Sequence, residues 1–316
     1  MAPQRVPPVP RPRSGAVLSV LLAVLAAVAN ALSSVLQRKA AREAPREDGV
    51  SPRLVWRLLH RPVWLCGVLA IIAGFLLQAT ALSFGRISVV QPVLVMELPA
   101  TLLLSSLVFK SRLGAREWGA SAAMAAGLAG LLFSLSPSGV PAPHAGNPEW
   151  AVASGLNIAL IAALVAWARL AGPGARRTAL LGVATGCTFG FTAALIKGVT
   201  EAYAHGFATL FTSWQLYAMI VAGAGAMVLL QAALQAGRLL VSQPGMTMSD
   251  PVVAIMWGIF VFGEVVRGGF YILMSVVAAA VVATGVILLA RSPLLAGTSG
   301  RDEREGSGGA RAEAAS

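Results

Sequence analysis

Hydrophobic and polar positions alternate along this chain in long blocks, not with the two-residue period of a half-buried strand. Apolar runs of about 20 residues recur, and the short segments between them hold most of the charges and prolines. A helix of about 20 apolar residues crosses the roughly 30 Å hydrocarbon layer of a membrane. We therefore predict an all-α, polytopic membrane protein whose nine spans are 16–37, 63–84, 87–109, 116–135, 150–170, 178–200, 211–235, 242–262 and 269–290.

One pattern of apolar and polar residues occurs twice, as LLQATALSFGRISVVQPVLVMELP at 76–99 and LLQAALQAGRLLVSQPGMTMSDP at 229–251. Both copies contain a Gly-Arg turn, a Gln-Pro pair and an acid just before a second proline, at a constant offset of 152 residues. An odd number of predicted spans separates equivalent points, so the copies cross the membrane in opposite directions. This predicts an inverted-topology repeat, which is typical of secondary transporters. We assign 16–135 to the first repeat, 136–177 to a loop and connector helix, and 178–290 to the second repeat.

Composition and charge agree with a membrane protein and predict its orientation. Only 12% of the residues are charged, against about a quarter in soluble domains. Three quarters of the 24 Lys and Arg residues fall on one side of the predicted spans, which places that side in the cytoplasm. We therefore expect a multi-pass protein of the cell (plasma) membrane with an external N-terminus, a cytoplasmic C-terminus and no nucleic-acid partner. Residues 1–15 and 291–316 are predicted to be disordered, and 16–37 is interpreted as an uncleaved first span.

Two acidic residues fall near the centres of predicted spans. Glu97 and Asp250 occupy nearly equivalent places in the two repeat copies, two residues and one residue before the second proline. A carboxylate at that depth costs a few kcal/mol or more, so it is a candidate functional group that faces a cavity or a partner. The alternative is a structural carboxyl that is protonated or hydrogen-bonded between helices.

Other residues of the repeat are candidates for the lining and for bending points. Gln91 and Gln243 stand at helix starts, where they either line a site or cap a helix. Trp257 belongs to a candidate lining that is otherwise apolar, with Met96, Met246 and Met248. Prolines inside spans free backbone carbonyls and act as hinges in transporters, and the hinge candidates are Pro92, Pro99, Pro244 and Pro251.

Charged residues near the predicted ends of spans have several interpretations. Lys197 either pairs with Glu201, binds an anionic substrate or extends to the interface, and we favour the last. Arg86 and Arg238 are predicted to anchor turns at the interface, and Glu264 is predicted to cap a helix or to gate.

Small residues recur at four-residue spacing on three spans, which allows close helix packing. Packing within the chain is the preferred interpretation, although the same faces are compatible with a homodimer. The three sets are Ala23, Ala27 and Ala31; Gly119, Ala123 and Gly127; and Gly182, Gly186 and Gly190.

Sequence signatures of enzymes are missing. The two cysteines, Cys66 and Cys187, fall in or near apolar spans and are interpreted as packing residues, and all three histidines fall in predicted loops. The chain contains no P-loop, HExxH or GxSxG motif, and no His or Asp cluster of the kind that a membrane-embedded transferase requires. We expect neither enzymatic activity nor a cofactor.

The repeated elements Ala81-Leu82, Gly85-Arg86 and Gln91-Pro92, together with Phe262-Gly263-Glu264, resemble the drug/metabolite transporter superfamily. Nine spans, an external N-terminus, Lys197-Gly198 and Ser136-Pro137 resemble its EamA-like and NIPA-like magnesium-transporter branch. The resemblance implies a helical bundle with two related halves that transports a solute. Arg112 stands where the superfamily often has Glu, and Glu97 and Asp250 match no family motif.

We therefore expect a secondary transporter that moves a small organic metabolite or drug across the lipid bilayer. The alternative is a Mg²⁺ transporter in which Glu97 and Asp250 are the metal ligands, since Mg²⁺ is usually held by one or two carboxylates. A membrane scaffold without transport is the third hypothesis.

Overall fold

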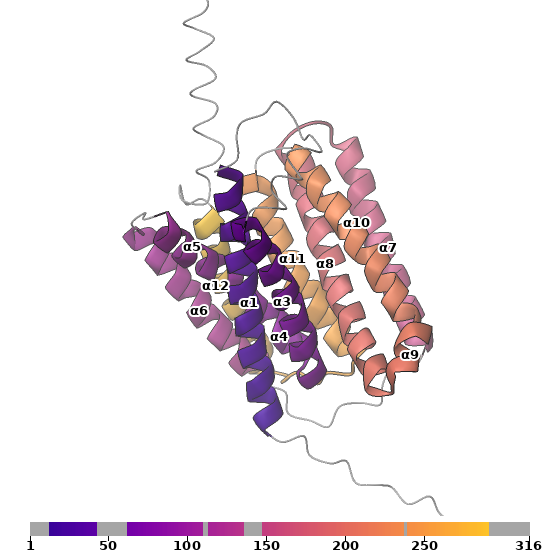
Figure 1. Cartoon of the computed structure of the whole chain (residues 1–316). Coiled ribbons are helices and arrows are strands. Elements are labelled where there is room, and N and C mark those ends of the chain that lie inside the picture. Colours follow the sequence, from indigo (N-terminus) through magenta and orange to yellow (C-terminus); the bar gives the residue numbers. More distant parts are fainter. Residues whose placement is uncertain (1–12, 43–61, 110–112, 136–146, 237–238, 291–316) are drawn as a thin grey trace, which may run out of the picture.

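The computed structural model describes residues 13–42, 62–109, 113–135, 147–236 and 239–290 (Figure 1). Within these ranges all regular secondary structure is helical, which confirms the predicted all-α fold. The helices are α1 (Arg13–Arg42), α3 (Pro62–Phe84), α4 (Ile87–Leu94), α5 (Glu97–Val108), α6 (Ala115–Leu135), α7 (Asn147–Leu170), α8 (Ala175–Ala204), α9 (Phe207–Thr212), α10 (Trp214–Ala236), α11 (Leu239–Phe260) and α12 (Phe270–Ala290).

Eight segments of the described chain are long and apolar enough to cross a membrane, so the chain is a membrane protein. They match eight of the nine predicted spans, and the third of them, Ile87–Val108, consists of α4 and α5. The remaining predicted span, 242–262, corresponds to α11, which is long enough but carries the polar stretch GMTMSDP at 245–251. That stretch lowers its hydropathy below that of the other eight. Nine spans and an inverted repeat thus stay predictions.

Among the eight segments long enough to span a membrane, α8 is the most enclosed, and it packs against α7, α10 and α11 (Figure 1). Its glycine face lies directly on the backbone of α11. A Cβ atom at Gly186 would meet the carbonyl oxygen of Met246 and the hydroxyl of Ser249, and one at Gly190 would lie 2.6 Å from the carbonyl oxygen of Asp250. The glycine face therefore packs within the chain, as preferred above, because any side chain here would separate the two helices.

The two copies of the repeated pattern differ in helix continuity. In the first copy the helix is interrupted at Val95 and Met96, between α4 and α5, so Pro92 and Pro99 flank the interruption. In the second copy α11 continues through Pro244 and Pro251. The prolines that were predicted to act as hinges thus accompany an interruption of the helix in the first copy and a continuous helix in the second.

The described helices pack differently at the two ends of the bundle. We call the end where α9 lies, at the bottom of Figure 1, the α9 end. Helix α4 packs against α1, α8 and α11, whereas α5, which continues away from the α9 end, packs mainly against α1 and has no comparable packing against α8 or α11. At the side of the bundle α6 pairs with α12. Among the eight segments long enough to span a membrane, α7 and α10 are the least buried, and their exposed apolar side chains suit contact with lipid.

Candidate functional site

The acids of the two repeat copies lie close together in the interior of the bundle. Glu97 begins α5 directly after the helix interruption, and Asp250 lies in the middle of α11. The two carboxyl groups are near enough to interact electrostatically. The side chain of Asn30, on α1, forms a hydrogen bond with the Glu97 carboxyl group. The sequence singled out both acids but gave no signal for Asn30, which belongs to a distant helix.

Helix α8 closes one side of the acid pair with small side chains. Cys187 forms a side-chain hydrogen bond with Ser249 and lies close to Asp250. The hydroxyl of Ser249 also donates to the carbonyl oxygen of Val183 on α8, at 3.0 Å. Because Gly190 allows α8 to touch the backbone of α11 at Asp250, the position of this acid is fixed by backbone packing.

Two buried polar atoms of the predicted site make no hydrogen bond to any described residue. They are Oδ1 of Asp250 and Nε2 of Gln91, whose side chain is 2% exposed. An unpaired polar group inside a membrane protein is costly, because lipid supplies neither donor nor acceptor. Both atoms are thus suited to bind a ligand or water.

The residues present set limits on a metal site. Among the residues that the structure describes, no three His, Cys, Asp or Glu side chains are grouped as metal ligands. The acids that interact electrostatically in the interior are Glu97 and Asp250, and Asn30 forms a hydrogen bond with Glu97. Such a two-carboxylate set fits Mg²⁺, which usually keeps several of its waters and takes one or two carboxylates.

An aromatic cluster lies on the same helices, toward the α9 end. Trp257 follows Asp250 by two helical turns on α11 and is 4% exposed. Its ring stacks on Phe191 of α8, with the ring centroids 5.3 Å apart, and lies 5.1 Å from Trp150 of α7. The remaining members are Trp214 and Phe262, both in edge-on contact with Trp150. The predicted lining residue Trp257 thus lies in a packed aromatic layer.

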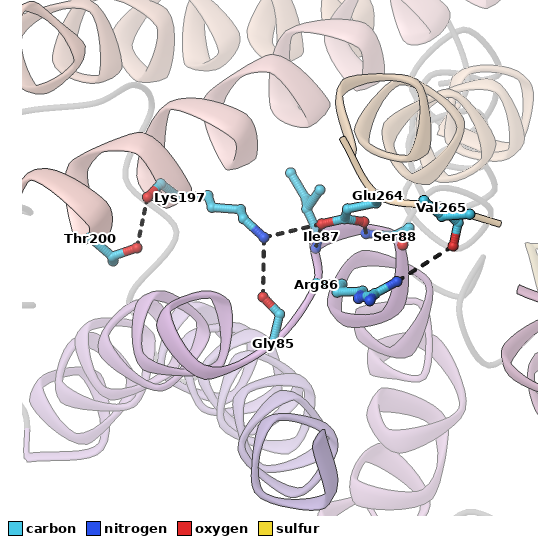
Figure 2. A network of polar contacts seen from close by, with 8 residues as sticks. All are labelled: Gly85, Arg86, Ile87, Ser88, Lys197, Thr200, Glu264 and Val265. Atoms are coloured by element: carbon cyan, nitrogen blue, oxygen red, sulfur yellow. Dashed lines mark hydrogen bonds and ion pairs between the residues drawn. The ribbon is translucent and has the colours of Figure 1, made fainter. Parts of the chain in front are cut away.

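Lys197 is buried and paired, which corrects the expectation that it extends to the membrane interface. Its Nζ atom lies 3.1 Å from Oε1 of Glu264 and donates to the carbonyl oxygen of Gly85 at 3.2 Å (Figure 2). The ammonium group also lies 4.8 Å from the ring centre of Phe262. A buried carboxylate and a carbonyl oxygen replace the solvation that the interface would have provided, so the cation remains inside.

Glu264 joins the loop after α11 to the start of α4. Its Oε1 accepts the backbone N–H of Ile87 at 2.8 Å, and its Oε2 accepts that of Ser88 at 3.0 Å (Figure 2). Gly263, with a φ of 58°, reverses the chain directly before it, a conformation that suits glycine. These bonds satisfy two of the N–H groups that the first turn of a helix leaves unpaired. The predicted capping role is present, but it serves a helix far away in the sequence.

The remaining predicted residues lie elsewhere. Gln243 is half-buried near the start of α11, two turns before Asp250. Arg86 donates to the carbonyl oxygen of Val265 at 3.4 Å. Arg112 and Arg238 lie outside the described residues. A hollow of about 340 Å³ on the surface of α10 contains no ionisable side chain, and its lining residues are Met227, Val228, Gln231, Ala232 and Gln235.

Comparison with known proteins identifies a relative that shows the family of this chain. The chain is 31% identical, over 209 residues, to an uncharacterized protein from Corynebacterium glutamicum. The similarity covers 65% of this chain and 71% of that protein, so it extends over most of both. No family model matches the chain, and no solved structure matches it.

Proposed function

The chain belongs to the same family as this uncharacterized Corynebacterium glutamicum protein, and we propose that it is a secondary transporter working by alternating access. Its substrate is a small organic metabolite or drug, which it moves across the cytoplasmic membrane. The observation that carries the proposal is the neighbouring pair of carboxyl groups, Glu97 and Asp250, in the interior of the bundle.

Two neighbouring acids inside a membrane protein call for a charge partner. Like charges repel more strongly in a medium of low dielectric constant than in water. A bound cation or proton relieves that repulsion, and Oδ1 of Asp250 has no hydrogen-bond partner among the described residues. We therefore assign to the pair the binding of a cationic group of the substrate, or of the proton that drives transport. Carboxyl groups in membrane spans commonly have such roles.

The repeated pattern supports alternating access. Glu97 and Asp250 come from nearly equivalent positions of two sequence copies that are predicted to run in opposite directions. Helix packing also recurs between the two proposed repeats, since α1 packs on α3 in the first and α8 packs on α10 in the second. The last helices of the two repeats, α6 and α12, pack on each other. Inverted repeats give a transporter two related gates around one central site. The resemblance to the drug/metabolite transporter superfamily points the same way.

Orientation in the proposal follows from the distribution of basic residues. If α11 also spans the membrane, the loops that hold most of the Lys and Arg residues lie on the side opposite to the α9 end. Basic loops stay in the cytoplasm. The α9 end then faces outward in the cell membrane, and the C-terminus lies in the cytoplasm.

The neighbours of the acid pair favour an organic substrate. Met96 and Cys187 adjoin the pair, and the stacked rings of Phe191 and Trp257 follow toward the α9 end. Binding sites for organic molecules are mostly apolar, with a few polar groups that fix orientation. Mg²⁺ is the second candidate, and the two-carboxylate set beside Asn30 is the observation that favours it.

A flux measurement tests the proposal. The purified protein is reconstituted into liposomes, and uptake is compared for Mg²⁺, amino acids and organic cations under an imposed proton gradient. We expect one organic class to accumulate above protein-free liposomes. Uptake of Mg²⁺ alone would replace the first candidate with the second. If no solute moves, the protein is a scaffold and the proposal is wrong.

A further inference from the structure

The hydrogen bonds around the Lys197–Glu264 ion pair connect elements from both halves of the chain at the α9 end. Lys197 comes from α8 and Glu264 from the loop after α11, whereas Gly85 lies in the turn after α3, and Ile87 and Ser88 begin α4 (Figure 2). Both ionic side chains are at least 90% buried. The loop is attached to α11, because the backbone N–H of Glu264 donates to the carbonyl oxygen of Gly258 at 2.8 Å. A movement that separates the two halves at this end must break these bonds.

The aromatic cluster forms a second layer between this ion pair and the acids. Along α11 the order is Asp250, Trp257 and then the loop with Glu264, and along α8 it is Cys187, Phe191 and Lys197. Phe262 joins the layers, since its ring contacts both Trp150 and the Lys197 ammonium group. A solute moving from the acid pair toward the α9 end therefore meets first packed rings and then a buried ion pair.

Burial is lower on the other side of the acid pair. On α11 the eight residues 243–250 are half-buried, whereas buried positions recur from Pro251 onward. In the first copy of the repeated pattern, residues 94–98 are half-buried, whereas residues 90–93 are buried. Helix packing shows the same difference, because α4 packs against α8 and α11, whereas α5 has no comparable packing against either. The tightly packed side of the acid pair is thus the one toward the α9 end.

We propose that Lys197 and Glu264 form the outer gate of the transport path, and that the structure has this gate closed. This inference rests on the proposed function and names the device that closes the site toward one face. Substrate release to that face requires Lys197 to leave Glu264 and the first turn of α4 to separate from the loop. While the gate is closed, a solute reaches the acid pair from the opposite face.

The two gate residues are not equivalent. Without Lys197, the Glu264 carboxylate keeps two backbone donors but loses its charge partner, and a buried carboxylate without that partner favours separation. Without a carboxylate at position 264, Lys197 keeps the carbonyl oxygen of Gly85. Exchanging the two residues would place an ammonium group against the N–H groups of α4, where a cation is unfavourable. The exchange therefore should not restore the gate.

Accessibility of a thiol at the acid pair tests the gate without a known substrate. Met96, half-buried beside Glu97, is replaced by cysteine in a Cys66→Ala/Cys187→Ala chain. A charged, membrane-impermeant methanethiosulfonate reagent is then applied to inside-out and right-side-out vesicles. With the gate intact, we expect labelling at least tenfold faster from the cytoplasmic face. Lys197→Met and Glu264→Gln should each raise the labelling rate from the outer face at least tenfold. The exchange variant Lys197→Glu/Glu264→Lys should keep that higher rate.

The control is Glu149→Gln, which removes an exposed carboxylate from the first turn of α7 and should leave both rates unchanged. Equal labelling from both faces with the gate residues intact would overturn the proposal, and this result does not depend on the folding of any gate variant. An unchanged outer rate in both Lys197→Met and Glu264→Gln would also overturn it. If the gate variants respond as expected but no solute moves, the transport proposal fails and the gate stands. If solute moves while labelling is unaffected, the gate alone fails.

Discussion

Glu264 accepts the backbone N–H of Ile87 at 2.8 Å, although 177 residues separate them in the chain. The same carboxylate accepts the N–H of Ser88, so one side chain holds the first turn of α4. The start of this helix therefore depends on a loop from the other half of the protein.

The first prediction concerns that dependence. Glu264→Ala leaves two buried N–H groups unpaired, and each such group costs about 1–3 kcal/mol. We expect hydrogen–deuterium exchange of the amides of Ile87 and Ser88 to become much faster than in the unchanged protein. Glu149→Ala, in an exposed first turn, is the control. Protected α4 amides in Glu264→Ala would show that the carboxylate does not hold the helix.

The second prediction concerns the contact between α8 and α11. A methyl group at position 186 would collide with Ser249 and with the backbone of Met246, so Gly186→Ala must push the helices apart. Overpacking of this kind costs about 1–3 kcal/mol. We expect a lower midpoint of thermal unfolding in detergent. Gly223→Ala, where a Cβ atom meets nothing within 4 Å, should leave the midpoint unchanged. Equal midpoints for both variants would contradict the close packing.

The third prediction concerns Trp150, which attaches the connector helix α7 to the aromatic cluster. Each aromatic pair contributes about 0.5–1.5 kcal/mol beyond buried area, and Trp150 contacts Trp214, Trp257 and Phe262. Trp150→Ala should therefore lower the unfolding midpoint by several degrees and shift the fluorescence of the remaining tryptophans to the red. Trp118, which is 57% exposed, gives the control Trp118→Ala. Equal effects of the two substitutions would argue against an aromatic layer at this place.

The fourth prediction separates positioning of Glu97 from general packing on α1. A buried side-chain hydrogen bond contributes about 0.5–1.5 kcal/mol, so we expect Asn30→Ala to raise the KM for the transported solute by up to about tenfold. The control is Ser33, which lies on α1 like Asn30. Ser33→Ala removes a buried hydrogen bond of 2.7 Å to the carbonyl oxygen of Gly67. It should lower stability and leave the KM unchanged. Equal KM values for the two variants would remove Asn30 from the site.

The sequence predicted the spans well, because a run of apolar residues reports directly on burial in lipid. It was less reliable for α11, whose polar stretch around Asp250 lowers the hydropathy of an interior helix. The electrostatic interaction of Glu97 with Asp250 agrees with their places in the repeated sequence pattern, which carried information that neither residue carries alone.

The partners of the charged residues could not be predicted. Lys197 and Glu264 lie 67 residues apart, and Asn30 and Glu97 belong to different helices. Periodicity and propensity report on near neighbours in the chain, whereas these contacts depend on how distant helices pack. For Lys197 the local pattern favoured the interface, and the tertiary ion pair overrode it. Continuity of a helix through proline is also set by its packing partners, which explains why Pro244 and Pro251 do not interrupt α11.

The most direct test of the transport mechanism is the initial rate of gradient-driven uptake in liposomes for Glu97→Gln, Asp250→Asn and the double variant. Each amide keeps the size of the side chain and removes its charge, and Glu149→Gln is the matched control on an exposed carboxylate. We expect each single variant to lose most of the rate, the double variant to show no gradient-driven uptake, and the control to transport normally. Normal uptake by the double variant would contradict the role of the acid pair.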